Sequence, residues 1–192
     1  MNTDMATFFD ELASDWDNAP DEYETRERLT GMMSLSPNAT IADIGCGQGV
    51  LFEHLLKADP AKIIAVDISG EMIRFAEELF NGNRIEYVHG DFLDVRLPML
   101  DAAIFFNSYP HFIDKDSLID KLAQVLKRGG TMIIAHNLSR LEINGMHKSD
   151  GASKLFVPLE NAEDEAKKFQ KFFTSDFLID DEEMYFVKMF RR

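Results

Sequence analysis

The segment with the clearest chemical meaning is DIGCGQG at residues 43–49, which lies between a short apolar run and an amphipathic stretch. Glycines let a backbone bend sharply and approach a ligand closely. A dinucleotide site favours the spacing G-x-G-x-x-G, whereas the spacing here is G-x-G-x-G. The acid at Asp43 would repel a pyrophosphate but attract an ammonium group, such as the one on a methionine derivative. The segment therefore predicts a site for a cationic ligand rather than for a dinucleotide.

Two further acids follow the next two apolar runs. Asp67 lies 18 residues after Gly49, close to the offset of roughly 20 residues that is typical of a ribose-binding carboxylate. Asp91 follows the third run and could accept from an adenine amino group, with Phe92 and Ile68 on either side of the ring. In an open α/β sheet a ligand binds beyond the carboxyl ends of the strands, where all three acids would lie.

The elements that must position these residues can be predicted from the pattern of apolar side chains. Short apolar runs occur at Thr40–Ile44, Ile63–Val66, Ile85–Val88, Ala102–Phe106 and Thr131–Ala135. Amphipathic stretches lie between them at Val50–Ala58, Glu71–Phe80 and Lys115–Leu126. This alternation predicts buried parallel strands with crossover helices. We expect Gly129-Gly130 to end the last of these helices and to begin the fifth strand.

Further elements are expected before and after this core. Two N-terminal helices are predicted, one from the spacing of Phe8, Phe9, Leu12 and Trp16 and one over Asp21–Met33. The tail predicts two helices and two closing strands. The helices are expected at Arg140–His147 and Asn161–Phe173, and the strands at Phe177–Ile179 and Met184–Phe190. The acids at 180–183 are expected to form a solvated turn.

With these motifs in this order, the chain resembles class I S-adenosylmethionine-dependent methyltransferases, in the broad small-molecule group described as methyltransferase type 11 or ubiquinone/menaquinone-like. ADIGCGQG resembles the first motif of the family, AVDIS its ribose acid, GDF its adenine acid, and LKRGGTMIIAH the strand that ends the common core. The resemblance implies a Rossmann-like, doubly wound α/β fold with a seven-stranded sheet, mostly parallel with an antiparallel last strand.

The resemblance also implies a reaction and a cofactor. The reaction would be methyl transfer from S-adenosylmethionine to a small-molecule acceptor by in-line displacement, with S-adenosylhomocysteine as the product. The residues expected to bind the cofactor are Asp43, Gly45, Cys46, Gly47, Gly49, Asp67, Ile68, Met72, Asp91, Phe92 and Asn107. We expect a single domain over residues 1–192. It would comprise a helical cap at 1–36, a cofactor-binding core at 37–136, and the substrate-side helix, last helix and closing strands at 137–192.

The stretch after the fourth strand is expected to begin the acceptor pocket, because it lies beside the sulfonium in the family. Tyr109 and His111 are the candidate catalytic residues, since a near-neutral pKa would suit His111 to a role as general base. A loop histidine with a structural role is the alternative. Enzymes that methylate DNA amino groups carry an Asn or Asp, two prolines and an aromatic residue here, and Asn-Ser-Tyr-Pro does not fit that pattern.

A polar group follows the fifth strand, and Arg140 in it could hold an acceptor carboxylate. Helix capping on a surface helix is the alternative. The candidate substrate-binding residues are His136, Asn137, Arg140, His147 and Trp16. Trp16 belongs to an apolar N-terminal stripe that would either pack on the sheet or close as a lid. The histidines lack the close spacing of metal ligands, so no metal site is predicted.

The amino-acid composition limits the kinds of partner that the chain is expected to bind. The 192 residues include 34 acids and 20 basic side chains, a formal charge of −14, which disfavours nucleic acid and anionic membranes. The single cysteine and the lack of a signal peptide or long apolar run indicate a cytoplasmic protein. We expect a monomer or homodimer. Two other functions stay open: a non-catalytic protein that binds the cofactor and acts through a partner, and a nicotinamide-dependent oxidoreductase, which the glycine spacing disfavours.

Overall fold

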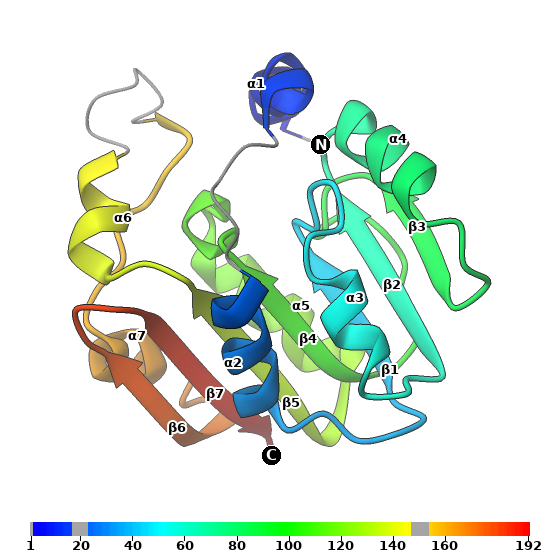
Figure 1. Cartoon of the computed structure of the whole chain (residues 1–192). Coiled ribbons are helices and arrows are strands. Elements are labelled where there is room, and N and C mark those ends of the chain that lie inside the picture. The colour runs from blue at the N-terminus through cyan, green and yellow to red at the C-terminus, as the bar shows by residue number, and fades with distance from the viewer. Residues whose placement is uncertain (1, 17–22, 147–153) are drawn as a thin grey trace. The chain divides into compact units, whose positions relative to one another are not determined.

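The computed structural model describes residues 2–16, 23–146 and 154–192, and it divides into two compact units, Met1–Pro98 and Met99–Arg192. Each unit combines strands with helices (Figure 1). In the described residues no helix is both long enough and apolar enough to cross a membrane.

The first unit contains three parallel strands in the order β3-β2-β1. Its strands are β1 (Thr40–Ile44), β2 (Lys62–Asp67) and β3 (Ile85–His89). Its helices are α1 (Thr3–Leu12), the short 3-10 helix η1 (Ala13–Asp15), α2 (Tyr23–Met33), α3 (Phe52–Leu56) and α4 (Gly70–Leu79). The expected start of the second helix at Asp21 lies outside the described residues.

Helix α4 illustrates how local sequence builds this unit. Ser69 caps its N-terminus, because its hydroxyl accepts a hydrogen bond from Met72 N at 3.0 Å. Met72, Ile73 and Ala76 recur at helical spacing and are buried. The helix packs on β2 and β3. It begins at Gly70, just after β2 ends at Asp67.

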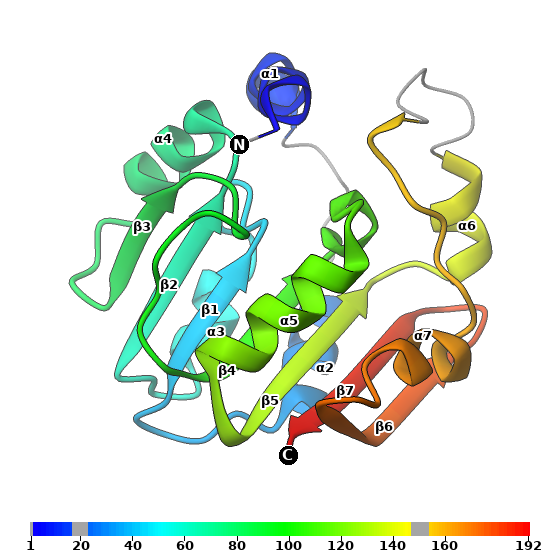
Figure 2. The ribbon, with the colours of Figure 1, turned by 180° about the vertical axis from the view of Figure 1, so that it is seen from behind.

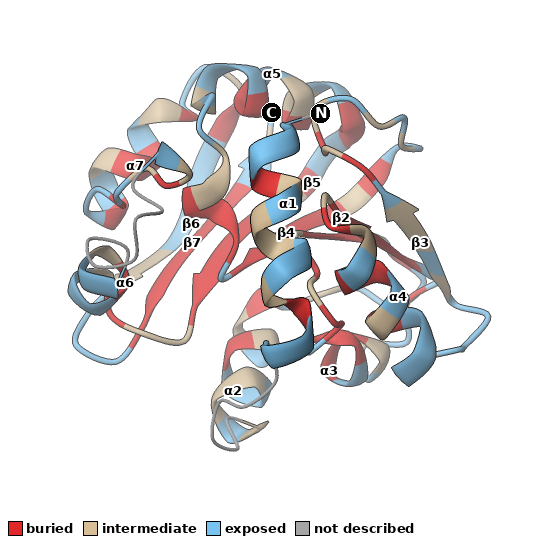
Figure 3. Ribbon diagram, turned by 90° about the horizontal axis from the view of Figure 1, so that it is seen from above, coloured by how far each residue is buried: buried red, intermediate tan, exposed pale blue. Residues whose placement is uncertain are grey.

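The second unit contains the strand order β4-β5-β7-β6. Strands β4 (Leu100–Phe106) and β5 (Leu126–His136) are parallel, whereas β7 (Tyr185–Arg191) runs antiparallel to both β5 and β6 (Phe173–Asp180). Its helices are the 3-10 helix η2 (Tyr109–His111), α5 (Lys115–Val125), α6 (Arg140–Met146) and α7 (Ala162–Lys168). Figure 2 shows α5 lying along β4 and β5. β4, β5 and β7 are buried over most of their length (Figure 3).

The predicted fold class is confirmed. The described residues hold seven strands, helices follow β1, β2 and β4, and the last strand is antiparallel to its neighbours. Every strand predicted in the core is present within two residues at its N-terminal end, except β5, which begins five residues early.

Two predicted boundaries are wrong. Gly129-Gly130 does not end a helix: α5 ends at Val125, and both glycines lie inside β5, where the register with β4 shifts and Gly129 has φ +76°. Helix α7 ends at Lys168, and Phe173 begins β6 rather than closing the helix. Phe169 and Phe173 are four residues apart and both buried, but a turn brings them into contact.

Candidate cofactor site

The glycine loop is attached to the end of the neighbouring strand. Gly45 N and Cys46 N both donate to Val66 O, at 2.8 and 3.1 Å. Gly45, Gly47 and Gly49 adopt φ of +71°, +54° and +85°, which favour glycine. The Cys46 thiol is buried, and burial raises its pKa, which fits a space-filling side chain rather than a nucleophile.

Asp67, at the end of β2, is bound to this loop. Its Oδ2 accepts from Gly47 N at 2.8 Å, and its Oδ1 accepts from Ser69 N at 2.9 Å. The side chain is buried, and burial raises its pKa, while the backbone hydrogen bonds oppose that rise. The predicted ribose acid and the predicted glycine loop are therefore joined in one structure.

Asp43, at the end of β1, is the acid whose environment is most unusual. It is only 2% exposed, and its Oδ1 is buried without a hydrogen-bond partner among the described residues. Burial, and secondly the charge of Asp67, raise its pKa to about 7. A buried carboxylate oxygen without a donor is unfavourable, so this position fits a cationic group of a bound ligand.

Asp91 follows β3, as the third predicted acid. Its Oδ1 accepts from Leu93 N at 3.0 Å, and the residue is half-buried. Phe92 and Met72 are buried, and Ile68 is half-buried. Asp43 and Asp67 thus lie at the carboxyl ends of β1 and β2, and Asp91 lies just after β3, as a ligand site in such a fold requires.

The N-terminal segment lies over the glycine loop. Gln48 Nε2 donates to Ala13 O at 2.6 Å, and this contact is buried. The Trp16 indole nitrogen is 3.8 Å from the position that a Cβ on Gly47 would take, and the Trp16 ring packs edge-on against Phe9. Trp16, a predicted substrate residue, is therefore next to the predicted cofactor loop and is 45% exposed.

Sequence reasoning missed Asp10 and Gln48. Asp10 Oδ1 accepts from Ser69 Oγ at 2.6 Å and from Glu71 N at 3.1 Å, so α1 contributes to the cap of α4. The Ser69 hydrogen bond contributes most to lowering the pKa of Asp10. Gln48 lies inside the glycine motif, which could have drawn attention to it. Asp10 carried no comparable signal.

In the second unit, the ends of β4 and β5 carry a pair of asparagines. Asn107 Nδ2 donates to Asn137 Oδ1 at 2.7 Å, and Asn137 N donates to Asn107 Oδ1 at 3.4 Å. Asn107 has φ +53°, a conformation that asparagine tolerates better than most residues. His111 Nδ1 lies 2.9 Å from Leu155 O.

Three other residues predicted to be catalytic or to bind substrate have their polar groups or rings packed against other residues of the protein. Tyr109 is fully buried, and its hydroxyl donates to Glu165. His136 is buried, and its ring packs edge-to-face with the Tyr185 ring. Arg140 Nε donates to both carboxylate oxygens of Asp180, at 3.2 and 2.9 Å, so its charge is paired within the protein.

His147 lies outside the described residues. Among the residues that the structure describes, no three His, Cys, Asp or Glu side chains gather as a metal site would require. The roles assigned above to individual residues stay predictions.

Comparison with known structures defines the fold class. A methyltransferase of Haloferax volcanii, solved in complex with the activator Trm112, superposes with a TM-score of 0.82 at 17% identity, over 95% of this chain and 97% of that one. The N-methyltransferase NodS of Bradyrhizobium japonicum, solved with S-adenosyl-L-homocysteine, gives 0.76 at 15% identity, over 97% and 98%. The chain has the fold of class I S-adenosylmethionine-dependent methyltransferases.

Sequence comparison identifies which part of the chain is similar to known methyltransferases. The family profile of a methyltransferase domain matches residues 41–130. The malonyl-[acyl-carrier protein] O-methyltransferase of Acetivibrio thermocellus is 35% identical over 94 residues, which are 48% of this chain and 33% of that protein. The match to a second curated relative, an uncharacterized methyltransferase of Mycobacterium bovis, spans 60% of that protein, so the chain covers less than two thirds of the length of both relatives. Together these findings show the fold of class I methyltransferases and a methyltransferase-domain match over residues 41–130.

Proposed function

We infer that the protein transfers a methyl group from S-adenosylmethionine to a small-molecule acceptor. The observation that carries this proposal is the buried, unpartnered Oδ1 of Asp43 beside a glycine loop. A sulfonium-bound methyl group is already activated for displacement. The chain's own tasks are therefore to bind the cofactor, align the acceptor and exclude water.

The first unit supplies the proposed cofactor contacts. The Asp43 carboxylate would pair with the ammonium group of the amino-acid portion, which the loop at 45–49 would border. Asp67 retains lone pairs beside its two backbone hydrogen bonds, and these would accept from ribose hydroxyls. Asp91 would accept from the adenine amino group, with Phe92 against the ring.

His111 is the proposed general base for a hydroxyl or thiol acceptor. A carbonyl oxygen can only accept, so Nδ1 must donate to Leu155 O. In the neutral ring this places the proton on Nδ1 and leaves the lone pair on Nε2, where a base needs it. An amine acceptor that is already neutral would need no base.

Several features support a small acceptor. The net charge of −14 disfavours nucleic acid, and the relatives above include proteins named for O- and N-methylation. Asn137, His136, Arg140, His147 and Trp16 are the proposed acceptor contacts. We further propose that residues 1–192 act as one domain in the cytoplasm, as a monomer or homodimer.

Calorimetry with S-adenosylhomocysteine and NAD tests the cofactor assignment. We expect the first to bind, NAD not to bind, and Asp67→Ala to abolish binding because two backbone donors and the ribose lose their shared acceptor. Unchanged affinity of Asp67→Ala would remove Asp67 from the site. Binding of NAD instead would favour the oxidoreductase alternative.

An acceptor screen with the purified chain tests catalysis. We expect His111→Ala to lower turnover while cofactor affinity is retained; unaltered turnover would assign His111 a structural role. A second candidate function is favoured by the Haloferax neighbour, which was solved with an activator. Under that alternative the chain alone would bind the cofactor and show no turnover until a partner protein is added.

A further inference from the structure

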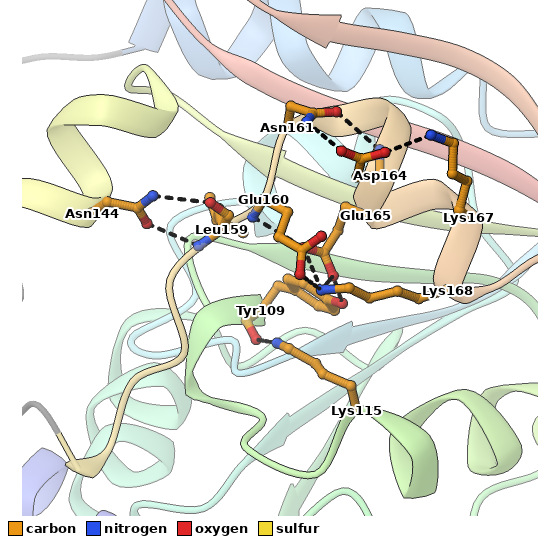
Figure 4. Close-up of polar contacts among 10 residues, drawn as sticks. All are labelled: Tyr109, Lys115, Asn144, Leu159, Glu160, Asn161, Asp164, Glu165, Lys167 and Lys168. Atoms are coloured by element: carbon orange, nitrogen blue, oxygen red, sulfur yellow. Dashed lines mark hydrogen bonds and ion pairs between the residues drawn. The ribbon is translucent and has the colours of Figure 1, made fainter.

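A buried acid in the second unit has no place in the proposed cofactor site. Glu165 in α7 is fully buried. Its Oε1 accepts from the Tyr109 hydroxyl, and its Oε2 accepts from Glu160 N at 3.3 Å and from Lys168 Nζ at 3.2 Å (Figure 4). A buried carboxylate is tolerated when donors surround it in this way. Glu165 is therefore fully engaged within the protein and is not available to a ligand.

Its partner Tyr109 has contacts at its backbone carbonyl, its ring and its hydroxyl. Lys115 Nζ donates to Tyr109 O at 2.7 Å and lies 3.4 Å from the centre of the Tyr109 ring. The ring also contacts Phe105 and Phe169, with centroids 6.0 and 6.2 Å away. The hydroxyl contact with Glu165 completes this set (Figure 4). Tyr109 thus has one defined orientation, fixed at both its backbone and its hydroxyl.

Tyr109 belongs to the post-β4 loop, residues 107–112. The segment that leads into α7 binds the same loop at two further points. Val157 N donates to Pro110 O at 2.9 Å, and His111 Nδ1 donates to Leu155 O at 2.9 Å. Helix α7 and the chain before it therefore hold the loop on which the proposed base lies.

We propose that Glu165 is a positioning residue, which acts through the Tyr109 hydroxyl to hold the post-β4 loop and His111 in the geometry that the acceptor needs. An apolar side chain could fill the same space. The carboxylate adds a directional bond, and a buried directional bond selects one arrangement among several that pack equally well. This inference rests on the proposed methyl transfer, and it gives Tyr109, a candidate catalytic residue on its sequence, a positioning role instead, because its hydroxyl is buried against Glu165.

The tautomer of His111 reports the position of the loop without any acceptor. Long-range proton–nitrogen NMR of the histidine rings, assigned with His111→Gln, should show the Nδ1-protonated form in the wild type. Tyr109→Phe and Glu165→Gln each weaken the link from α7 to the loop. We expect both to lose that signal in favour of a mixture of tautomers.

Asp164→Asn is the matched control. Asp164 precedes Glu165 in α7 and binds the lysine three residues further on, as Glu165 does, but its side chain is 45% exposed and has no contact with Tyr109 (Figure 4). We expect the His111 signal of this variant to stay as in the wild type. A loss of the signal in all three variants would show a general loosening of α7 and would overturn the proposal.

Turnover of an acceptor found in the screen gives the second measurement. We expect Tyr109→Phe and Glu165→Gln to lower kcat by roughly ten- to a hundredfold, since small misplacements of reacting groups have effects of that size. KM for the cofactor should not change. The double variant should be no slower than the slower single variant, because both changes break one link.

These outcomes separate the two proposals. If both variants keep the Nδ1-protonated signal and wild-type kcat, Glu165 is a packing residue and the positioning role is wrong. If the wild type itself fails to bind S-adenosylhomocysteine, the proposed function is wrong instead. Tyr109→Phe preserves volume and removes the same bond, so it decides the question even if Glu165→Gln does not fold.

Discussion

Asp43→Asn is the substitution on which the proposed site makes its most quantitative prediction. In the native protein burial and the Asp67 charge raise the pKa of Asp43 from 3.8 to about 7. Between these values the native state holds a proton that the unfolded chain releases. The free energy of unfolding therefore falls as pH rises through this window, and Asp43→Asn removes that contribution.

The size of the effect follows from the two pKa values. Between pH 5.5 and 7.5 this carboxyl should remove about 2 kcal/mol of stability from the wild type, at about 1.4 kcal/mol for each unit of pKa difference. Urea denaturation of the cofactor-free protein at both pH values measures it. Because each protein is compared with itself, any constant effect of the asparagine cancels.

Cofactor affinity should change in the opposite direction. Only the ionised carboxylate attracts an ammonium group, and ionisation of a group with a pKa of about 7 rises about twentyfold between pH 5.5 and 7.5. Calorimetry should show S-adenosylhomocysteine binding about twentyfold more tightly at pH 7.5 in the wild type, and weakly at both pH values in Asp43→Asn.

Asp59→Asn provides the control. Asp59 is exposed, pairs with Arg84 and has φ +51°, which asparagine tolerates well. It should keep the wild-type difference between the two pH values. If Asp43→Asn and the wild type lose equal stability between pH 5.5 and 7.5, and bind the cofactor equally, the reasoning about Asp43 is refuted.

Two further predictions concern packing and burial. Gly49→Ala would place a Cβ 2.4 Å from the Phe52 ring at φ +85°, and it should lower the free energy of unfolding by about 2–4 kcal/mol. Gly82→Ala is the control, because a Cβ there would meet nothing within 4 Å, and it should leave the free energy of unfolding unchanged. Equal midpoints of denaturation for the two variants would contradict this prediction. Burial lowers the pKa of Lys115 from 10.5 to about 7, so the unfolded chain binds the extra proton and stability should rise by about 2 kcal/mol between pH 7 and 9. Lys115→Met should lose this pH-dependent rise in stability, which denaturation at the two pH values measures. If the variant gains as much stability as the wild type, the lowered pKa of Lys115 is not the cause of the rise.

The parts of the fold that the sequence predicts well are those that depend on neighbours along the chain. The core strands and the glycine loop follow from apolar runs and glycine spacing. The same local signals are ambiguous for Phe169 and Phe173, whose spacing fits both a helix face and a turn. The side chains packed around the turn decide between them.

Contacts between distant residues were beyond sequence reasoning. Asp10 and Ser69 are 59 residues apart, and Tyr109 and Glu165 are 56 apart. The sequence predicts that Arg140 could hold an acceptor carboxylate and that the acids at 180–183 form a solvated turn. Asp180 instead ends β6 and binds the guanidinium. Which charges meet is decided by the fold, not by the local composition.

Two of the buried carboxylates, Asp43 and Glu165, are enclosed to a similar extent, at 2% and 0% exposure. Glu165 is surrounded by donors from a tyrosine, a lysine and the backbone, whereas one oxygen of Asp43 has no donor in the described residues. Desolvation penalises both charges, but only Glu165 is compensated within the fold. A buried acid that the fold leaves uncompensated is suited to a cationic group of a ligand, which is why we propose a binding role for Asp43 and a positioning role for Glu165.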